Sequence, residues 1–286
     1  MKYEIKSINE PIVEIVPLNK LIKFICPKNT EGIINIQIID DSSFELLVLE
    51  NSHWTINVEY PNGYINSNNT IEIQEYASLK HNIIIYEEIN EVVMNQKVNI
   101  SNSGEYTSAL LDVSEVNIKF NNQINLNGEY ASSYFRSAVV SNKDAKKKYE
   151  IATSNNAFYT SSKMDNYGVC KDNSKLEFIG IGTIKKGFKQ SNNHQNSKII
   201  VFDELSNASV QPLLYIDEYD VLASHSAAVG KVNDEHMYYL CSRGLSEEQA
   251  RGFITRGYLL PVLSYFLDES IKEKAAMTLE RRVVNA

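Results

Sequence analysis

Cysteine is scarce in this chain of 286 residues, and the three that occur, Cys26, Cys170 and Cys241, stand far apart without any CxxC spacing. A disulfide framework or a self-contained zinc site needs cysteines at short, paired spacings. A cluster held by cysteine alone needs about four thiolates. The sequence therefore excludes such a site within one copy, and any metal cluster is either shared with another chain or absent.

Long hydrophobic runs and an excess of positive charge are also missing. Charged residues recur from the first residues onward, and no apolar stretch approaches the roughly 20 residues of a membrane-spanning helix. The sequence therefore predicts neither a signal peptide nor a membrane span, and we expect a cytoplasmic protein. The net charge is -8, whereas a surface that binds nucleic acid needs a basic face to neutralise phosphates. We therefore expect no nucleic-acid partner.

Short β-type runs are what the sequence has in quantity. Apolar or alternating segments rich in Ile, Val, Tyr and Phe follow one another, among them IINIQII, FELLVLE, WTINVEY and KIIVF. Clusters of Asn, Ser, Gly and Asp separate them and are typical of turns. Many short strands without intervening helices fit a sandwich, a barrel or a solenoid, and periodicity alone does not choose between these. No strict repeat forces a solenoid.

The pattern becomes helical after residue 231. Asn233 is placed to cap one helix, and Gly244 lies where a left-handed residue is expected at its end. Ser246 and Gln249 have the spacing of a capping box at the start of a second helix. Pro261 should kink or end that helix, because its ring crowds the carbonyl of the preceding turn.

A third, amphipathic helix is expected from Asp268, with an apolar stripe formed by Ile271, Ala275, Leu279 and Val283. In the first helix, Cys241 shares a face with Met237, which predicts a buried thiol. The chain thus divides into an amino-terminal segment (1–32), a β core (33–231) and a carboxyl-terminal helical domain (232–286).

The most specific stretch of the sequence is ASHSAAVGKVNDEHMYYLCSRGLSEEQARGFITRGYLLPVL, residues 223–263. Upstream of it stand an FxGxGxIxK pattern that begins at Phe178, and then Asn207, Pro212 and Leu214. In these residues the sequence resembles the SufB/SufD family, the non-ATPase subunits of the SUF system that assembles iron-sulfur clusters. The matching positions of the long stretch are Ser224, His225, Ala228 to Lys231, Tyr239, Leu240, Ser242, Arg243, Gly244, Glu248, Ala250, Arg251 and Gly257.

The resemblance implies a mainly β fold, a right-handed parallel β-helix (β-solenoid) core followed by a carboxyl-terminal α-helical segment. The frequent asparagines agree with this fold, because stacked turns and strands can form ladders of side-chain amides. A solenoid must also protect its open ends, since unpaired strand edges invite aggregation. We expect the terminal helices to act as caps.

His225 is the candidate metal ligand. A neutral imidazole can ligate iron, and thiolates usually complete such sites. In the family the scaffold subunit SufB carries an acidic residue beside this histidine and a cysteine about one strand earlier; here Ser224, Ser226 and approximately Ser197 take those places. The resemblance is therefore closer to SufD, or to a short SufB-like form. Without the resemblance, a lone histidine in a strand is more often a hydrogen-bonded core or interface residue.

By resemblance, the chain is a non-ATPase subunit without enzymatic activity of its own. It is expected to pair with a SufB/SufD-type paralogue or with a second copy of itself, to share a transient iron-sulfur cluster with that chain, and to dock a SufC-like ABC ATPase. The residues expected to bind or support the ATPase are Tyr239, Arg243, Gly244, Phe253, Gly257 and Tyr258.

Other patterns in the sequence point to different functions, but more weakly than the family resemblance does. Glu218 and Asp220 would share one face of a strand, as the carboxylates of a β-helix that binds or cleaves polysaccharide do. The run GTIKKGFKQ has Phe188 where the lysine of a phosphate-binding loop must stand, so it predicts no ATPase. The lysines of residues 143–148 are expected in a solvated loop. A free-standing structural solenoid is a third alternative.

Overall fold

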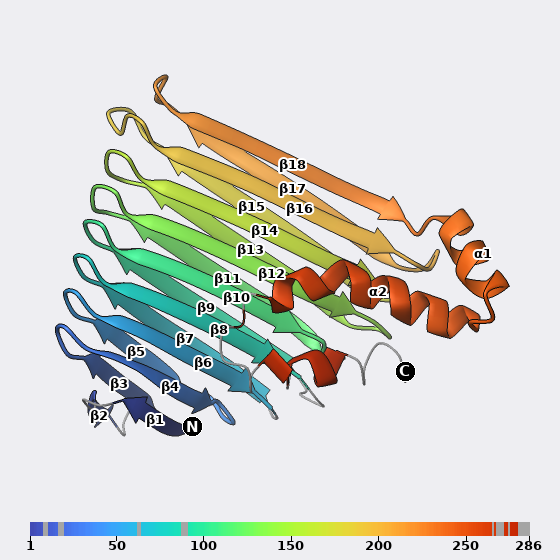
Figure 1. The fold of residues 1–286 in the computed structure, drawn as a ribbon, viewed down its shortest axis with the longest axis horizontal. Coiled ribbons are helices and arrows are strands. Elements are labelled where there is room, and N and C mark those ends of the chain that lie inside the picture. Colours follow the sequence, from blue (N-terminus) through green and yellow to red (C-terminus); the bar gives the residue numbers. More distant parts are fainter. Residues whose placement is uncertain are drawn as a thin grey trace.

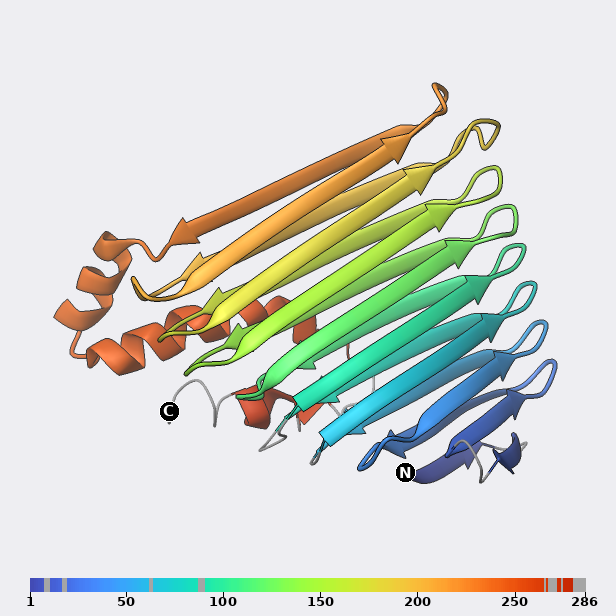
Figure 2. The same ribbon diagram turned by 180° about the vertical axis from the view of Figure 1, so that it is seen from behind.

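The protein is a two-sided stack of strands with helices at one side, as the ribbon diagrams show (Figures 1 and 2). The computed structural model describes residues 1–7, 11–16, 20–61, 64–86, 91–264, 266, 272–273 and 275–279. Consecutive strands from β3 onward alternate between two sheets, so that one strand of each sheet together forms a coil.

Sheet A contains, in spatial order, β1 (Lys2–Ser7), β4 (Glu31–Gln37), β6 (His53–Tyr60), β8 (Ser78–Ile85), β10 (Glu105–Asp112), β12 (Ser132–Ser141), β14 (Ser161–Cys170), β16 (Asn192–Val201) and β18 (Leu222–Lys231). Sheet B contains β17 (Asn207–Ile216), β15 (Lys175–Ile184), β13 (Lys146–Asn155), β11 (Asn117–Leu126), β9 (Glu91–Ile100), β7 (Tyr64–Ile73), β5 (Ser43–Val48), β3 (Leu21–Cys26) and β2 (Ile12–Val16).

This topology confirms the predicted parallel β-solenoid, with about seven turns. Neighbouring strands from β3 and β4 to β17 and β18 pair in parallel. The two first strands differ, because β1 pairs with β4 and β2 with β3 in antiparallel fashion. Strand pairing therefore begins at Lys2 and not at residue 33, and the regular coil starts with β3.

Alternate residues of each strand point into the space between the sheets, where side chains of successive coils stack. Phe120, Tyr149 and Phe178 form one such column, with ring centroids 5.9 and 5.8 Å apart in edge-to-face contact. On the outside of sheet B, Asn121 Nδ2 donates to Asn95 Oδ1 at 2.8 Å, and Asn95 Nδ2 donates to Asn68 Oδ1 at 3.0 Å. The predicted amide ladders are thus present.

The turns that lead from sheet B to sheet A share a recurring backbone conformation, which is hard to recognise in the sequence because few residues recur with it. All of them except the turn between β17 and β18 place a non-glycine residue in the left-handed region, for example Tyr76 (φ 56°), Tyr130 (φ 61°) and Tyr159 (φ 59°). A small buried residue follows, and the rings of Tyr130 and Tyr159 stack 4.8 Å apart. The tetrapeptide EYAS occurs at both 75–78 and 129–132. Because only these turn positions recur, no strict repeat was predicted.

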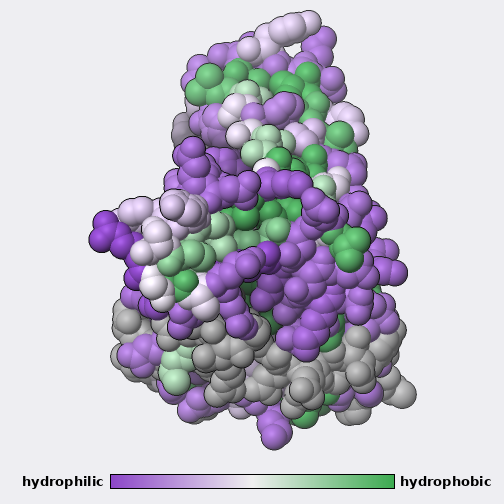
Figure 3. Space-filling model, turned by 90° about the vertical axis from the view of Figure 1, so that its right-hand side faces the viewer, coloured by the Kyte–Doolittle hydropathy of each residue, from purple (hydrophilic) through white to green (hydrophobic). Residues whose placement is uncertain are grey.

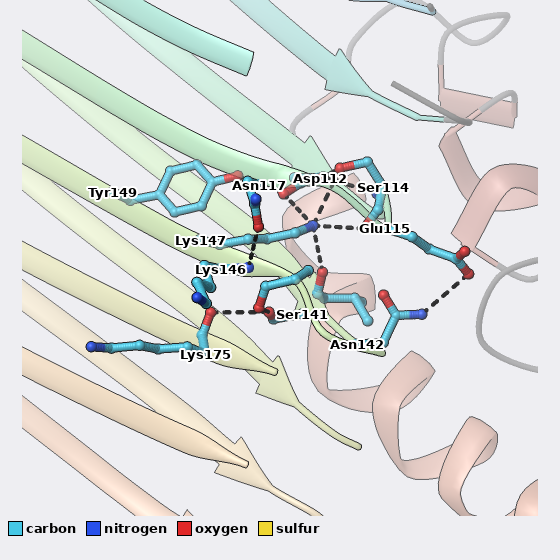
Figure 4. Close-up of polar contacts among 12 residues, drawn as sticks. Asp112, Ser114, Glu115, Asn117, Ser141, Asn142, Lys146, Lys147, Tyr149 and Lys175 are labelled. Carbon is cyan, nitrogen blue, oxygen red and sulfur yellow. Dashed lines mark hydrogen bonds and ion pairs between the residues drawn. The ribbon is translucent and has the colours of Figure 1, made fainter. Parts of the chain in front are cut away.

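One buried charged network corrects the prediction of a solvated lysine loop (Figure 4). Lys147 points into the core at the start of β13, and its side chain and that of Asp112 are both 0% exposed. Lys147 Nζ donates to Asp112 Oδ2 at 2.6 Å, to Val140 O at 2.8 Å and to Ser114 O at 2.7 Å. The Tyr149 hydroxyl donates to Asp112 Oδ2 at 2.6 Å. Every charge of this network therefore has close partners.

The described helices do not cap the end of the solenoid, contrary to expectation. Helix α2 (Glu247–Leu263) crosses the outer face of sheet A (Figure 1), where Leu259 and Val262 pack against outward-facing residues of β10, β12 and β14. Helix α1 (Asp234–Ser242) has no buried residue. Helix α2 lies on sheet A because the outer face of this sheet carries an apolar patch, which includes Leu111 and Val140. Burying this patch against α2 removes apolar surface from water.

The helix boundaries follow the predicted capping residues. Asn233 Oδ1 accepts from the amide of Glu235, and Ser246 and Gln249 form the expected capping box. Pro261 lies inside α2, which ends soon after it at Leu263. Of the predicted third helix, Asp268, Ile271 and Val283 lie outside the described residues. Residues 272–273 and 275–279 are helical, and Ala275 and Leu279 are buried. No described helix is long and apolar enough to span a bilayer.

Candidate functional site

The last coil, formed by β17 and β18 and here called the terminal coil, is open on one side. Each of its strands has a sheet neighbour on one side only within the described structure, and every residue of β18 is exposed. Tyr215, Leu222 and Val229 are 57%, 64% and 47% exposed. Figure 3 shows hydrophobic residues gathered at this end of the molecule, at the top of the view. Such an unpaired, partly apolar end is a natural place for another chain to bind.

His225 lies in the middle of β18, on the row of side chains that continues the solenoid interior. Its register partner in β16 is Gln195, which is 4% exposed and points between the sheets. Ala223 and Ala227, the neighbours of His225 on this row, are small, and both are exposed. The imidazole is therefore accessible at the open end of the molecule.

The three serines that stand in place of the family's acidic and cysteine ligands take different positions. Ser224 and Ser226 flank His225 on the opposite face of β18, and Ser224 Oγ lies 2.8 Å from His194 Nδ1. Ser197 is buried, pairs with Ala227 and accepts a 3.0 Å hydrogen bond from Asn166 Nδ2. Within the described ranges no three His, Cys, Asp or Glu side chains gather as a metal centre. His225 thus belongs to no such cluster among the residues that the structure describes.

The cysteines are not brought together. Cys26 and Cys170 are buried, and burial raises the pKa of both thiols, so neither is a ready thiolate. Cys241 was predicted to be buried beside Met237, but it is exposed, because α1 stands away from the solenoid. The three thiols therefore form no site in this chain.

The candidate partner-binding residues divide between two surfaces. Tyr239 and Phe253 are 57% and 62% exposed, and the Arg243 guanidinium lies 5.2 Å from the centre of the Tyr239 ring. Tyr258 instead packs edge-to-face on Tyr167 of β14 at 5.6 Å, and burial raises the pKa of its hydroxyl. Tyr258 therefore helps to attach α2, whereas the other three are free to meet a partner.

The two glycines of this set have different roles. Gly244, at φ 97°, ends α1 in the left-handed conformation that was predicted for it. Gly257 is exposed on α2, and a Cβ built there would meet nothing within 4 Å. Gly244 thus sets the direction in which the chain enters α2, and Gly257 leaves the outer surface of α2 flat.

An ion pair ties α2 to the turn that precedes β17. Arg251 Nη1 donates to Asp203 Oδ1 at 2.7 Å, and Nη2 donates to Glu247 at 3.1 Å. Partial burial of Asp203 tends to raise the pKa of its carboxyl by desolvation. The hydrogen bonds that it accepts from the Asp172 amide and from Arg251 outweigh this effect, so the pKa of Asp203 lies below its usual value. The helices are thus connected to the terminal coil by Arg251 and by the chain itself, which passes from β18 into α1.

The carboxylates that suggested a polysaccharide enzyme are not arranged as a catalytic pair. Strand β17 ends at Ile216, so Glu218 and Asp220 lie in a turn and not on one strand face, contrary to prediction. Glu218 accepts hydrogen bonds from the amides of Gly187 and Tyr219, and these bonds lower the pKa of its carboxyl. A general acid needs a raised pKa, so Glu218 is unsuited to that role.

Sequence reasoning missed the buried amides of β16, the strand next to β18. Gln195 and Asn193 are buried in β16, opposite Gly180 and Gly182 of the FxGxGxIxK pattern. The signal was present, because two glycines alternate along a strand while the segment 192–197, NNHQNS, has amides where apolar residues normally alternate. Together these features indicate amides that cross the core.

Fold and site together define a β-solenoid protein whose distinctive surfaces are an open terminal coil with an accessible histidine and a pair of helices beside it. Residues 35–258 match the family described as "SUF system FeS cluster assembly, SufBD core domain". The match covers most of the chain, which therefore belongs to the SufBD core family of iron-sulfur cluster assembly proteins.

Individual relatives agree with this assignment. The iron-sulfur cluster assembly protein SufD of Bacillus subtilis (strain 168) is 38% identical over 117 residues, which are 41% of this chain and 27% of that protein. Escherichia coli (strain K12) SufD is 22% identical over 166 residues, 58% of this chain and 39% of the relative. A SufBD family protein of Pyrococcus horikoshii is 34% identical over 84 residues, 29% of this chain and 18% of that protein. The matched segment thus spans well under two thirds of each relative.

Proposed function

We propose that this chain is a non-ATPase subunit of a SUF-type iron-sulfur cluster assembly complex. Its terminal coil pairs with a second chain of the SufB/SufD type, or with another copy of itself, and its helices bind a SufC-like ATPase in the cytoplasm. The observation that carries the proposal is the open terminal coil of a SufBD-family solenoid, with apolar residues and His225 exposed on the same end. A second chain seated there would cover both strand edges and the apolar row.

The iron-sulfur cluster is cargo that the two chains hold between them. This chain contributes the imidazole of His225, and softer ligands come from the facing chain, because the described residues offer no thiolate near the histidine. The role of this chain is structural and mechanical, without an enzymatic activity of its own.

The exposed aromatic side of the helices fits an ATPase partner. Tyr238, Tyr239 and Phe253 are 78%, 57% and 62% exposed, which is more apolar surface than two solvated helices need. Nucleotide-driven movement of the ATPase would reach the terminal coil through Val232 and through the Arg251–Asp203 ion pair. Such coupling requires that the ATPase bind the two arrangements of the pair with different affinities.

Two other functions are less well supported. A β-helix that cleaves polysaccharide would need a catalytic pair of carboxylates, but Glu218 and Asp220 lie in a turn, where Glu218 accepts hydrogen bonds from the amides of Gly187 and Tyr219. We expect a glycan-cleavage assay to be negative. A free-standing structural solenoid would leave the open coil and the helix aromatics without a partner.

Docking of the ATPase is tested by co-purification. We expect wild-type chain, co-expressed with a SufC-type ATPase and a SufB-type chain, to form one complex on size-exclusion chromatography. The double change Tyr239→Asp and Phe253→Asp should weaken ATPase binding at least about tenfold, because it places charges in the contact. Tyr76→Asp is the matched control, since Tyr76 is 60% exposed on a turn of the β-solenoid. Absence of a wild-type complex in every nucleotide state would remove the mechanical proposal.

The role of His225 is tested separately. After anaerobic reconstitution of the purified complex, His225→Ala is expected to lower the iron and sulfide content to less than about half of wild type, because one ligand of the shared cluster is lost. His194→Ala is the control, since His194 lies one strand away on the outer face. Equal iron content in the two variants would make His225 a structural residue.

A further inference from the structure

The two EYAS turns of the solenoid place an exposed tyrosine on each side of the turn between β9 and β10. Tyr76 and Tyr130 are 60% and 59% exposed, and both adopt the left-handed conformation. The register of β8, β10 and β12 puts Tyr76, Ser103 and Tyr130 at equivalent positions of three successive coils. These turns lie along the edge of the solenoid away from the helices (Figures 1 and 2). The tyrosines therefore belong neither to the terminal coil nor to the helix surface.

The ring of Tyr130 is held by its neighbour in the next coil. It stacks on the ring of Tyr159 with the centroids 4.8 Å apart and the planes at 3° to each other. This separation equals the spacing of adjacent strands, about 4.8 Å, so the stack runs along the solenoid axis. Tyr159 in turn contacts Phe158, whose ring centroid is 6.4 Å away. The second face of Tyr130 therefore looks toward the coils of Ser103 and Tyr76.

The column of rings is interrupted at Ser103. This serine is half-buried and carries no ring, so the outer parts of Tyr76 and Tyr130 have no side chain of their own row between them. Two coils separate the tyrosines, which is about 9.6 Å at the usual strand spacing. A peptide in the polyproline II conformation repeats every three residues, or about 9.3 Å. Residues i and i+3 of such a peptide would therefore meet one tyrosine each.

The same three turns carry negative charge only. Glu75, Glu105 and Glu129 are exposed, and none of the three turns contains a lysine or an arginine. Asn102 connects two of them, because its Nδ2 donates to Glu75 Oε1 at 3.0 Å and its Oδ1 accepts from the Glu129 amide at 3.0 Å. Single-stranded nucleic acid also stacks on tyrosine, but these carboxylates repel its phosphates. They attract the lysine or arginine of a peptide.

We infer that Tyr76, Ser103 and Tyr130 form a docking surface for a proline-rich, basic peptide segment of a partner protein. Prolines i and i+3 pack on the two tyrosine rings, and a basic residue beside them pairs with the glutamates. Spaced aromatic side chains suit a polyproline II segment, because such a segment is already extended and loses little conformational entropy on binding. The inference goes beyond the proposed function, since it uses neither His225 nor the helices.

Fluorescence anisotropy with the purified chain tests this surface. The probe is a fluorescein-labelled polyproline peptide that ends in Arg-Arg, and we expect wild type to bind it with a Kd of about 10–100 µM. Tyr76→Ala and Tyr130→Ala should each weaken binding at least about tenfold, because each removes one ring contact. Tyr219→Ala is the matched control, since Tyr219 is 99% exposed in the last turn between the two sheets.

Ser103→Tyr is the decisive variant, because it completes the column of rings. Tyrosine fits the backbone at this position, as Tyr76 and Tyr130 show by adopting the same left-handed conformation in their own turns. We expect the peptide to bind at least about tenfold more weakly, although the variant exposes more aromatic surface. Binding as tight as that of wild type would show that ring area alone attracts the peptide, and the inference would be wrong. It would also be wrong if wild type bound no peptide at about 1 mM.

Three more measurements identify the occupant and separate this surface from the proposed function. A polyproline peptide that ends in Glu-Glu should bind at least about fivefold more weakly at low salt, and equal binding would contradict a basic partner. Binding of maltohexaose that is lost in Ser103→Tyr, without binding of the peptide, would make this a saccharide site and overturn the inference. Tyr76→Asp should lose the peptide and keep the ATPase, whereas Tyr239→Asp with Phe253→Asp should do the reverse. Urea unfolding of each variant distinguishes lost contacts from lost folding.

Discussion

Replacing Lys147 by methionine is expected to lower the free energy of unfolding by about 3–5 kcal/mol, because the change leaves the buried Asp112 carboxylate without its cation. Methionine keeps nearly the volume of the lysine stem, so the loss comes from charge and hydrogen bonding and not from a cavity. Three acceptors besides the carboxylate lose their donor as well, namely Val140 O, Ser114 O and Ser114 Oγ. Urea unfolding followed by circular dichroism measures the effect.

Two further variants show whether the buried pair is the cause. Lys146→Met, at the exposed neighbouring position of β13, should change stability by less than about 0.5 kcal/mol. Adding Asp112→Asn to Lys147→Met should recover part of the loss, since no uncompensated charge then remains in the core. A cost below about 1 kcal/mol for Lys147→Met would contradict the interpretation. Agreement of the m-values with wild type is needed, because stacked repeats can unfold in steps.

Mild acid is expected to destabilise the protein through His81. This residue of β8 is 1% exposed, its Nδ1 lies 3.0 Å from the Tyr106 hydroxyl, and its Nε2 is buried without a partner. Burial lowers the pKa of His81 from 6.5 to about 3, because the charged imidazolium would lose its hydration. The folded protein therefore keeps His81 neutral, whereas the unfolded chain binds a proton below pH 6.5.

The direction of the pH effect follows from this difference. The pKa of His81 is lower in the folded protein than in the unfolded chain. The free energy of unfolding is therefore highest above about pH 6.5, where both states hold His81 neutral, and it falls progressively as the pH drops toward 3, because only the unfolded chain binds the proton. From pH 7 to pH 5 the expected loss from this one group is about 2 kcal/mol. Unfolding free energies measured at half-unit pH steps in urea give the slope.

His81→Gln is the decisive comparison, since glutamine can still bond to Tyr106 but does not titrate. This variant should lose about 2 kcal/mol less than wild type between pH 7 and pH 5. His53→Gln provides the control, because His53 is an exposed histidine of β6, the strand next to β8. Identical pH slopes for wild type and His81→Gln would show that the buried imidazole does not titrate as argued.

Much of the local structure was predictable because it depends on residues close in sequence. Asn233, Gly244 and the Ser246–Gln249 pair mark the helix ends, and all of them act as their capping chemistry predicts. The strand character of the core also follows from local alternation. Stacking into a solenoid was known only from the family resemblance, since the repeated turn residues are few and are separated by strands of varied sequence.

Predictions that depended on packing were less accurate. Two predictions were wrong, that Cys241 is buried and that the helices cap the solenoid. Both failed because α2 packs on the outer face of sheet A, which is built by strands far apart in the sequence. Lys147 looked like one more lysine of a charged run, and only the fold brings Asp112 to it from 35 residues away. The roles of His225 and of the helix aromatics stay predictions.

By itself, the sequence determined the strand character of the core, where the first two helices begin, and that the three cysteines have no CxxC spacing. These properties depend on local propensity, on capping and on composition, which act over a few residues. Only the tertiary structure decided that the last coil is open, that His225 stands above the buried amide of Gln195, and that Lys147 is buried. Those facts arise from the register of parallel strands, in which residues about one coil apart become neighbours and local sequence carries no record of them.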